Sequence, residues 1–448
     1  MKTSLRIIAF VVFSFLLLMS DLFGQETITL TIEQAIRLGL ETSKALHLSS
    51  LKVAYADAKR NEANASRLPS LKASGAYTRL SSVPPFEFTG SQLGTFVLDR
   101  PALDNYNFKL SLEQPLFTGF GLESRSDIAS YSAQAAEEDN RKDKNDLVYN
   151  VQSAYWNLYK AREFEKVIDE NVEQVKAHLN DVQNSYDHGI VTKNELLKVE
   201  VQLSNTQILQ IDARNNARLA KLALNNVLGI PLETETILSS EIRQNEKEYD
   251  EVNSLVRQAI EQRPDIQAMN YRVKASKSGV TLARSGWFPQ IYASGNYYYS
   301  RPNHRYVPTI DQFNNSWDVN LSASFDLWNW GMTANQTDQA DALLAQTQDA
   351  LGQLRNNVTL EVTQFYLNLH QSRERVGLAQ KAVTFAEENY HITNEKFKSG
   401  LALNSDMLDA EAALLQAKWN YIQSLVDHEL SDVKLQQAIG NDLSSANK

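Results

Sequence analysis

Residues 317–327 read Trp-Asp-Val-Asn-Leu-Ser-Ala-Ser-Phe-Asp-Leu, and every second side chain is apolar. This alternation has the period of a β-strand, whose successive side chains point to opposite faces. The segment therefore has one apolar and one polar face. Residues 106–113 alternate in the same way, and residues 69–77 and 289–299 do so more weakly. We expect two strand pairs, over about 69–118 and about 289–328.

The strands belong to two copies of one pattern. Residues 68–77 (LPSLKASGAY) align with residues 288–297 (FPQIYASGNY) at an offset of 220. Farther along the offset is 211, and it relates Leu116-Phe117 to Leu327-Trp328, Asn157-Leu158 to Asn368-Leu369, Gly189 to Gly400, Glu200 to Glu411 and Gly229 to Gly440. A register kept over more than a hundred residues indicates an internal duplication. We expect repeats at 25–240 and 241–448, each beginning with a helix.

A long helical hairpin is expected after each strand pair, over about 119–229 and about 330–440. Residues 122–187 contain neither glycine nor proline, and residues 333–399 contain only Gly352 and Gly377. Apolar side chains in the first helix recur at alternating steps of four and three, at Ile168, Val172, Val175, Leu179, Val182 and Tyr186. Such spacing is typical of a seam that packs one helix against another.

Short glycine turns separate the helices of each hairpin. They read Asp187-His188-Gly189 and Lys398-Ser399-Gly400. Glycine suits the left-handed conformation that commonly follows a helix end. We expect Asn194, and Asn404 or Ser405, to cap the helices that follow.

Composition excludes several classes of protein. The chain has 448 residues, no cysteine and a formal net charge of -10, which argues against thiol chemistry, lipid attachment at cysteine and nucleic-acid binding. Residues 119–124 follow a strand, but they lack the third glycine of a dinucleotide site. The seven histidines show no metal-ligand spacing. We expect no enzymatic activity, no cofactor and no metal.

The N-terminus predicts export. Lys2 and Arg6 precede or flank an apolar run at residues 7–19, which is too short to cross a bilayer comfortably. We expect a signal peptide over residues 1–24, with an N-terminal membrane anchor as the alternative. No later stretch reaches about 18 apolar residues, so the mature chain is either soluble after export or a β-barrel, whose strands escape hydropathy windows.

The strands have the length that a tilted strand needs to cross a bilayer. Aromatic residues gather where strands meet helices, as in the aromatic girdle of a membrane interface, at Phe117, Phe120, Trp287, Phe288, Trp328 and Trp330. The alternative is a soluble β-sandwich with these aromatics in its core.

Four strands cannot close a membrane barrel, and open strand edges cannot face lipid. Several chains must therefore share one barrel, and three chains give twelve strands. The expected fold is mainly α with a membrane β-barrel: four strands per chain in a 12-stranded trimeric β-barrel, continuous with a long helical α-barrel.

These features resemble the TolC family of outer-membrane efflux proteins over about residues 30–440. The resemblance rests on the duplication, the strands that begin at proline, the Pro115–Gly119 strand-to-helix turn and two hairpin signatures. The signatures are Tyr186-x-x-Gly189-x-x-x-x-Asn194-Glu195-Leu196-Leu197 and Phe397-x-x-Gly400-x-x-x-x-Ser405-Asp406-Met407-Leu408-Asp409-Ala410-Glu411.

The resemblance implies a homotrimer in the outer membrane, in contact with its lipid, with the helical barrel in the periplasm. It implies a periplasmic adaptor, an inner-membrane transporter of the RND, ABC or MFS type, and export of drugs, toxic compounds or metal ions. A duct for type I protein secretion is one alternative. An exported coiled-coil scaffold or adaptor is another, from a different class.

The resemblance also assigns candidate site residues. Asp406 and Asp409 would form a ring of carboxylates that constricts the channel, since residues three apart share a helix face. The first copy has Glu195 and Lys198 at these positions, so only the second hairpin fits. The alternative is an ordinary first helical turn, where the helix dipole favours acids.

Adaptor docking would use the hairpin tips, at Gly189, Ile190, Val191, Gly400, Leu401 and Ala402. The alternative is that these residues only pack the turn between two helices. Phe397 replaces a tyrosine of the family, and Ala402 stands where an arginine can occur. The aromatic and basic tip residues that hold some members of the family shut are therefore only partly matched in this chain.

Overall fold

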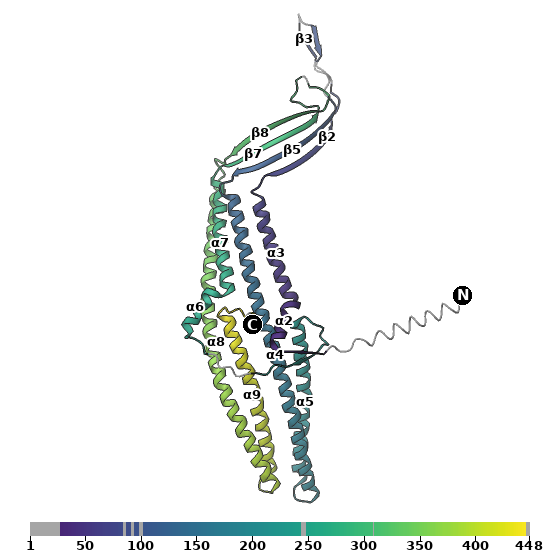
Figure 1. Cartoon of the computed structure of the whole chain (residues 1–448), viewed down its shortest axis with the longest axis vertical. Helices are drawn as coiled ribbons and strands as arrows, with labels where there is room; N and C mark the ends of the chain where they lie inside the picture. The colour runs from purple at the N-terminus through teal and green to yellow at the C-terminus, as the bar shows by residue number, and fades with distance from the viewer. Residues whose placement is uncertain are drawn as a thin grey trace, which may run out of the picture. The chain divides into compact units, whose positions relative to one another are not determined.

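The computed structural model describes residues 27–83, 87–90, 94–97, 102–242, 248–307 and 309–444 (Figure 1). The expected signal peptide at 1–24 lies outside them. The chain divides into two compact units. The described residues of the first fall within 27–51, 138–267 and 353–444, and those of the second within 52–137 and 268–352. Four helices contribute to both units: α3 (Lys44–Ala65), α4 (Gly121–Asp187), α7 (Pro264–Arg284) and α8 (Met332–Lys398).

The second unit contains a four-stranded antiparallel sheet in the order β2-β5-β7-β8, whose strands lie side by side in Figure 1. These strands span Ser70–Arg79, Asp104–Phe117, Gln290–Arg301 and Asn314–Ser324. A small hairpin, β3 (Glu87–Gly90) and β4 (Gly94–Val97), lies between β2 and β5 in the chain, and the 3-10 helix η2 (Ser285–Trp287) precedes β7.

One strand end differs from the expectation. The alternating pattern runs to Leu327, but β8 ends at Ser324, which pairs with Gln290 of β7. The residue before Gln290 is Pro289, which has no N–H to donate to a sheet ladder. Pairing therefore stops there, and residues 325–327 leave the strand although their pattern continues.

The register gathers the apolar side chains on one face of the sheet. Leu71 is opposite Leu112, and Leu110 is opposite Tyr297, which is itself opposite Trp317. The large side chains of this face are exposed: Leu71, Phe108, Leu110, Leu112, Tyr297, Tyr299, Trp317, Val319 and Leu321. An exposed apolar face of this extent marks a surface that contacts protein or lipid.

The other face of the sheet is polar and cross-linked by side-chain hydrogen bonds. Ser111 donates to the Asn296 side-chain oxygen at 2.8 Å, and Asn296 donates to Asp318 at 2.7 Å. These three residues stand on three neighbouring strands, β5, β7 and β8. The two faces thus differ in chemistry across the whole width of the sheet.

The turns from strand to helix have the same backbone conformation in both repeats, but glycine occupies a different position in each turn. Two successive residues are left-handed in each: Gly119 (φ 62°) and Phe120 (φ 67°), and Trp330 (φ 55°) and Gly331 (φ 78°). A Cβ on Gly119 would lie 2.5 Å from the Ser285 carbonyl oxygen, whereas one on Gly331 would lie 3.9 Å from the Asn335 side-chain nitrogen. Close packing therefore requires glycine at position 119.

Gly119→Ala is expected to lower the free energy of unfolding by about 3 kcal/mol, since left-handed strain of about 1–2 kcal/mol adds to a steric clash. Gly331→Ala is the matched control and should lose only about 1–2 kcal/mol, because it meets the strain without the clash. Thermal unfolding of the purified variants, followed by circular dichroism, measures both. Equal losses would contradict the packing argument.

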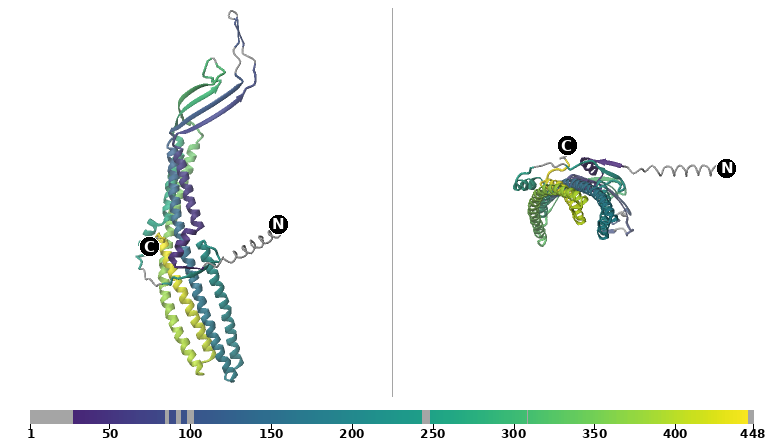
Figure 2. Two further views of the ribbon diagram at one scale, coloured as in Figure 1. Left: turned by 45° about the vertical axis from the view of Figure 1, so that its right-hand side comes forward. Right: turned by 90° about the horizontal axis from the view of Figure 1, so that it is seen from below.

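The first unit contains two helical hairpins, α4 with α5 (Lys193–Leu228) and α8 with α9 (Asn404–Ala438). They lie side by side, and the view from below shows them along a curve (Figure 2). The expected seam is confirmed, since Ile168, Val172, Val175 and Val182 are buried and Leu179 packs beside them, although Tyr186 at its end is exposed. Across the described residues, no helix is both long and apolar enough to span a bilayer.

The remaining elements of this unit surround a core centred on Tyr155 of α4. Strands β1 (Thr27–Leu30) and β6 (Glu235–Leu238) pair in parallel, and helices α2 (Ile32–Thr42) and α6 (Val252–Gln262) follow them. The buried Tyr155 hydroxyl donates to the Leu30 carbonyl at 2.9 Å and accepts from the Ser240 N–H at 3.0 Å. One side chain thus ties both short strand segments to the long helix.

Candidate functional site

Both hairpin tips are closed by the same glycine turn. Gly189 and Gly400 are left-handed, with φ of 73° and 72°. The N–H of Ile190 donates to the Ser185 carbonyl at 2.9 Å, and the N–H of Leu401 donates to the Lys396 carbonyl at 2.8 Å. These bonds satisfy carbonyls that a helix end otherwise leaves unpaired. The expectation of a glycine past each helix end is confirmed.

The residues after the two glycines have different surroundings. Ile190 is 76% exposed and Leu401 is 79% exposed, so both tips present a large apolar side chain. Val191 packs instead against the hairpin core formed by Val175, Val182, Leu196 and Val199. Ala402 is half-buried. Among the proposed docking residues, the structure thus leaves Ile190 and Leu401 free for a partner and places Val191 in the packing of its own hairpin.

Asp406 lies in the first turn of α9 and Asp409 in the turn that follows, and both are exposed. The Leu403 N–H donates to the Asp406 carboxylate at 2.9 Å, so Asp406 caps its own helix. This contact belongs to the alternative interpretation, in which acids stabilise a helix start. Asp409 stands three residues along on the same exposed side of the helix.

The helix caps differ from the expected ones. Helix α5 begins at Lys193 after Thr192, and α9 begins at Asn404 after Leu403. Asn194, Asn404 and Ser405 are therefore all inside helices rather than at their caps. The prediction was wrong because Asn404 is buried and its amide makes tertiary hydrogen bonds.

A polar network centred on Asn404 joins the two hairpins. Its amide N–H₂ donates to the Glu195 carboxylate at 2.9 Å and to the Glu195 carbonyl at 3.2 Å. Its side-chain oxygen lies 2.7 Å from Nε2 of His178, which donates to it. Burial lowers the pKa of His178, so its ring is neutral at physiological pH. Sequence reasoning missed this network because Asn404 is more than 200 positions away from both His178 and Glu195.

In the same network, the acidic side chain of the first tip, Glu195, is fully engaged in hydrogen bonds. Lys198 donates to Glu195 at 2.8 Å, and the hydrogen bonds from Lys198 and Asn404 lower the pKa of that carboxyl. Glu195 and Lys198 are the repeat counterparts of Asp406 and Asp409. The first hairpin thus carries an ion pair where the second carries two exposed carboxylates.

The aromatic candidates all lie at junctions between strands and helices. Phe117, Phe120 and Phe288 form one edge-to-face cluster, with ring centroids 5.5 to 6.4 Å apart. Trp328 and Trp330 pair at 5.8 Å and are largely exposed, and Trp287 is also exposed. The structure therefore brings together side chains from both repeats, at the ends of the strands with the exposed apolar face.

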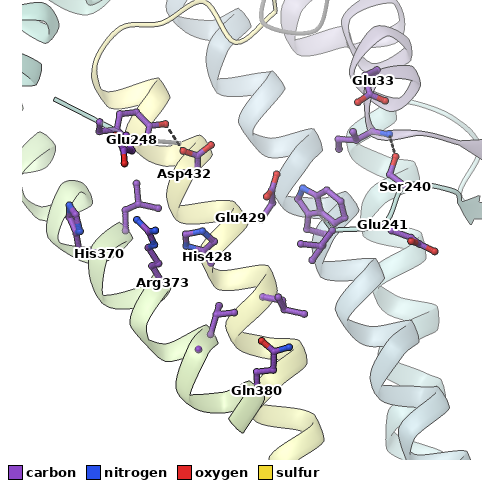
Figure 3. Close-up of a pocket in the computed structure, with 18 of the residues that line it drawn as sticks. Glu33, Ser240, Glu241, Glu248, His370, Arg373, Gln380, His428, Glu429 and Asp432 are labelled. Carbon is purple, nitrogen blue, oxygen red and sulfur yellow. Dashed lines mark hydrogen bonds between the residues drawn. The ribbon is translucent and has the colours of Figure 1, made fainter. Parts of the chain in front are cut away.

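A cavity of about 1060 Å³ opens in the first unit between α8, α9 and residues 31–33, 239–242 and 248–249 (Figure 3). Ile32 N–H donates to the Ser240 hydroxyl at 3.0 Å, and the Tyr249 hydroxyl donates to Asp432. Burial raises the pKa of Tyr249, which keeps it a donor. Within the part of the chain that the structure describes, no three His, Asp or Glu side chains are grouped to hold a metal ion.

Known proteins resemble this chain over most of its length. The family model described as "Outer membrane efflux protein" matches residues 35–230 and 255–441, one match for each repeat. Outer membrane protein TolC of Vibrio cholerae serotype O1 is 22% identical over 316 residues, covering 70% of this chain and 72% of that protein. Probable outer membrane lipoprotein SilC of Salmonella typhimurium is 22% identical over 412 residues, covering 91% and 85%.

The fold has solved counterparts. The crystal structure of the outer membrane protein VceC from Vibrio cholerae superposes with a TM-score of 0.77 at 18% identity, covering 92% of this chain and 96% of that one. At that identity the likeness concerns the fold. Together with the family match over both repeats, it leads to one conclusion: the chain belongs to the outer membrane efflux protein family.

Proposed function

We propose that this chain forms one third of a passive outer-membrane duct that exports small molecules. One observation carries the proposal: a sheet with membrane-length strands has an exposed apolar face and a polar face, and its edge strands β2 and β8 each lack a second neighbour among the described residues. Unpaired edges in hydrocarbon leave backbone groups without hydrogen bonds, which costs several kcal/mol per group. Closure with further copies removes the edges.

The duplication predicts how the copies join. The two strand pairs share one register, because the Tyr77–Tyr106 pair of the first repeat corresponds to the Tyr297–Trp317 pair of the second. Inside the chain, β5 pairs with β7 and sets Ser111 opposite Asn296. Replacing each by its repeat counterpart sets Ser322 of β8 opposite Ala76 of β2 in the next copy. Three copies close a twelve-stranded barrel.

The hairpins support the same closure. In the chain, Trp419 of α9 packs on Phe164 of α4, with ring centroids 4.3 Å apart. The counterpart of Trp419 is Ile208 on α5, which is exposed. Helix α8 likewise exposes an apolar row, at Leu360, Leu367, Leu378, Phe385 and Ile392. The exposed Ile208 of α5 and the apolar row of α8 would be covered by contact between neighbouring copies, which gives a helical barrel in the periplasm.

The tips support a periplasmic partner. Ile190 and Leu401 stand at the ends of two adjacent hairpins, where exposed apolar residues mark a protein contact. We infer docking on a periplasmic adaptor, which links the duct to an inner-membrane transporter of the RND, ABC or MFS type. The aromatic residues at the strand ends would lie at the outer-membrane interface.

The purified chain is expected to form trimers that conduct cations in a planar lipid bilayer, with current blocked by divalent cations. Three copies of Asp406 and Asp409 would surround a narrow axis, and such rings concentrate cations. Asp406→Ala/Asp409→Ala should weaken the block by about tenfold or more. Glu173→Ala, a remote exposed acid on α4, is the control and should leave the block unchanged.

Absence of any conductance would contradict the duct itself. Conductance with the same divalent block in Asp406→Ala/Asp409→Ala would retain the duct and reject the carboxylate ring. In that case Asp406 would serve only as the cap of α9.

A further inference from the structure

Glu411 of α9 is a carboxyl group inside the packed hairpins. It is 1% exposed, and neither of its two oxygens has a hydrogen-bond partner among the described residues. Removing an ionised carboxylate from water without a partner is so costly that such groups usually become neutral. A neutral carboxyl has an O–H donor, and this donor needs a nearby acceptor.

Asn171 of α4 supplies that acceptor by its position. The antiparallel contacts Phe164–Trp419 and His178–Asn404 set the register of α4 against α9. Asn171 is midway between the two α4 residues, and Glu411 is midway between the two α9 residues. Asn171 is 5% exposed, and its side-chain oxygen also lacks a partner. The register thus places the two buried groups at the same level of the α4–α9 interface, where one shared proton would satisfy both.

The surrounding groups do not neutralise a charge on Glu411. On α8, Tyr390 lies close enough for Glu411 to raise its pKa, after the larger effect of burial. On α4, His178 is neutral, and Glu170 pairs with Lys418 of α9 at 3.2 Å, seven residues along from Glu411. Burial alone raises the pKa of Glu411 to about 7, from an ordinary value of 4.5.

We propose that Glu411 and Asn171 form a proton-binding site that holds the second hairpin against the first. The protonated carboxyl donates its O–H to the Asn171 side-chain oxygen. Loss of the proton leaves a charge without a partner, and that charge gains water only when α4 and α9 separate. The site is a pH-sensitive contact between α4 and α9 of one chain. The proposal therefore does not depend on whether the chain forms a duct.

The sign of the pH effect follows from linkage. The carboxyl has its ordinary pKa of 4.5 when the hairpins part and a pKa of about 7 when they are in contact. The contact is therefore strongest at acid pH, weakens as pH rises from about 4.5 to about 7, and changes little above that. The full range corresponds to a change of about two orders of magnitude in the equilibrium between contact and separation.

The repeat supplies a matched control. Glu200 of α5 is the counterpart of Glu411, but it is exposed. Glu411→Gln keeps the shape and can still donate an N–H to Asn171, so it mimics the neutral state at every pH. Glu200→Gln removes an equivalent carboxyl that has no buried environment in the chain.

Infrared spectroscopy of the purified full-length chain tests the protonation. The wild type should show a protonated carboxyl whose signal disappears around pH 7, and the same signal should be absent from Glu411→Gln and present in Glu200→Gln. A wild type without any carboxyl that titrates above about pH 6, or an unchanged signal in Glu411→Gln, would overturn the proposal.

A distance measurement tests the movement. Spin labels at Glu173→Cys on α4 and Gln416→Cys on α9 report the separation of the hairpins, and the chain has no other cysteine. Labelled chains are mixed with excess unlabelled chains, so that only distances within one chain contribute. The wild type and Glu200→Gln should show a longer or broader distance above about pH 7, and Glu411→Gln a constant one. A distance that does not change with pH in the wild type would reject the proton-dependent contact between α4 and α9.

Discussion

A chain carrying Ser322→Cys and Ala76→Cys is expected to become a covalent species of three chains on oxidation. Ser322 and Ala76 lie on the open edge strands β8 and β2, and the repeat register sets them opposite each other in neighbouring copies. Opposed residues in an antiparallel pair have Cβ atoms about 4.5–5.5 Å apart, close to the span of a disulfide. Electrophoresis without reductant should show a ladder that stops at three.

The chain offers controls for this result. Ser111→Cys/Asn296→Cys is the counterpart pair inside the chain and should form a disulfide without joining chains. Ser322→Cys/Thr78→Cys shifts the register by two residues, which sets the Cβ atoms about 7–8 Å apart, and it should stay largely unlinked. A ladder that stops at two chains, or that continues past three, would contradict the twelve-stranded barrel.

Ile190→Asp/Leu401→Asp is expected to abolish export while leaving the trimer intact. Both side chains are exposed at the tips, so their replacement costs the fold little, whereas a charge in an apolar contact with an adaptor loses binding. Export is measured in cells as the accumulation of a dye or a toxic compound. The fraction of heat-modifiable trimer in the outer membrane is measured in the same cells.

Leu403→Asp is the control for the tip variant. Leu403 is also exposed at the second tip, but it precedes α9 rather than following the glycine turn. Normal export in Ile190→Asp/Leu401→Asp would place the adaptor contact elsewhere. Loss of the trimer together with export would show a folding defect, and Ile190→Ala/Leu401→Ala would then separate the two effects.

The sequence by itself determined the elements and their order. Alternation in residues 106–113 and 317–327, the two offsets of 220 and 211, and the glycines after each long helix are local or repeated signals. Local signals survive in the fold because strand period, helix seam and turn conformation depend on near neighbours. The strands, hairpins and tip turns accordingly lie close to where they were expected, except that β8 ends at Ser324 and residues 325–327 leave the strand.

Only the tertiary structure decided what the polar residues do. Asn404 had the pattern of a cap, but it bonds His178 and Glu195 because the two hairpins meet there. Glu200 and Glu411 match in sequence, yet only Glu411 is buried, since α9 has α4 beside it and α5 exposes its corresponding face. The burial of a side chain and its hydrogen-bond partners depend on contacts between segments hundreds of residues apart. Two copies of one sequence pattern look alike, so the pattern does not show which copy is covered by a neighbouring helix and which is exposed.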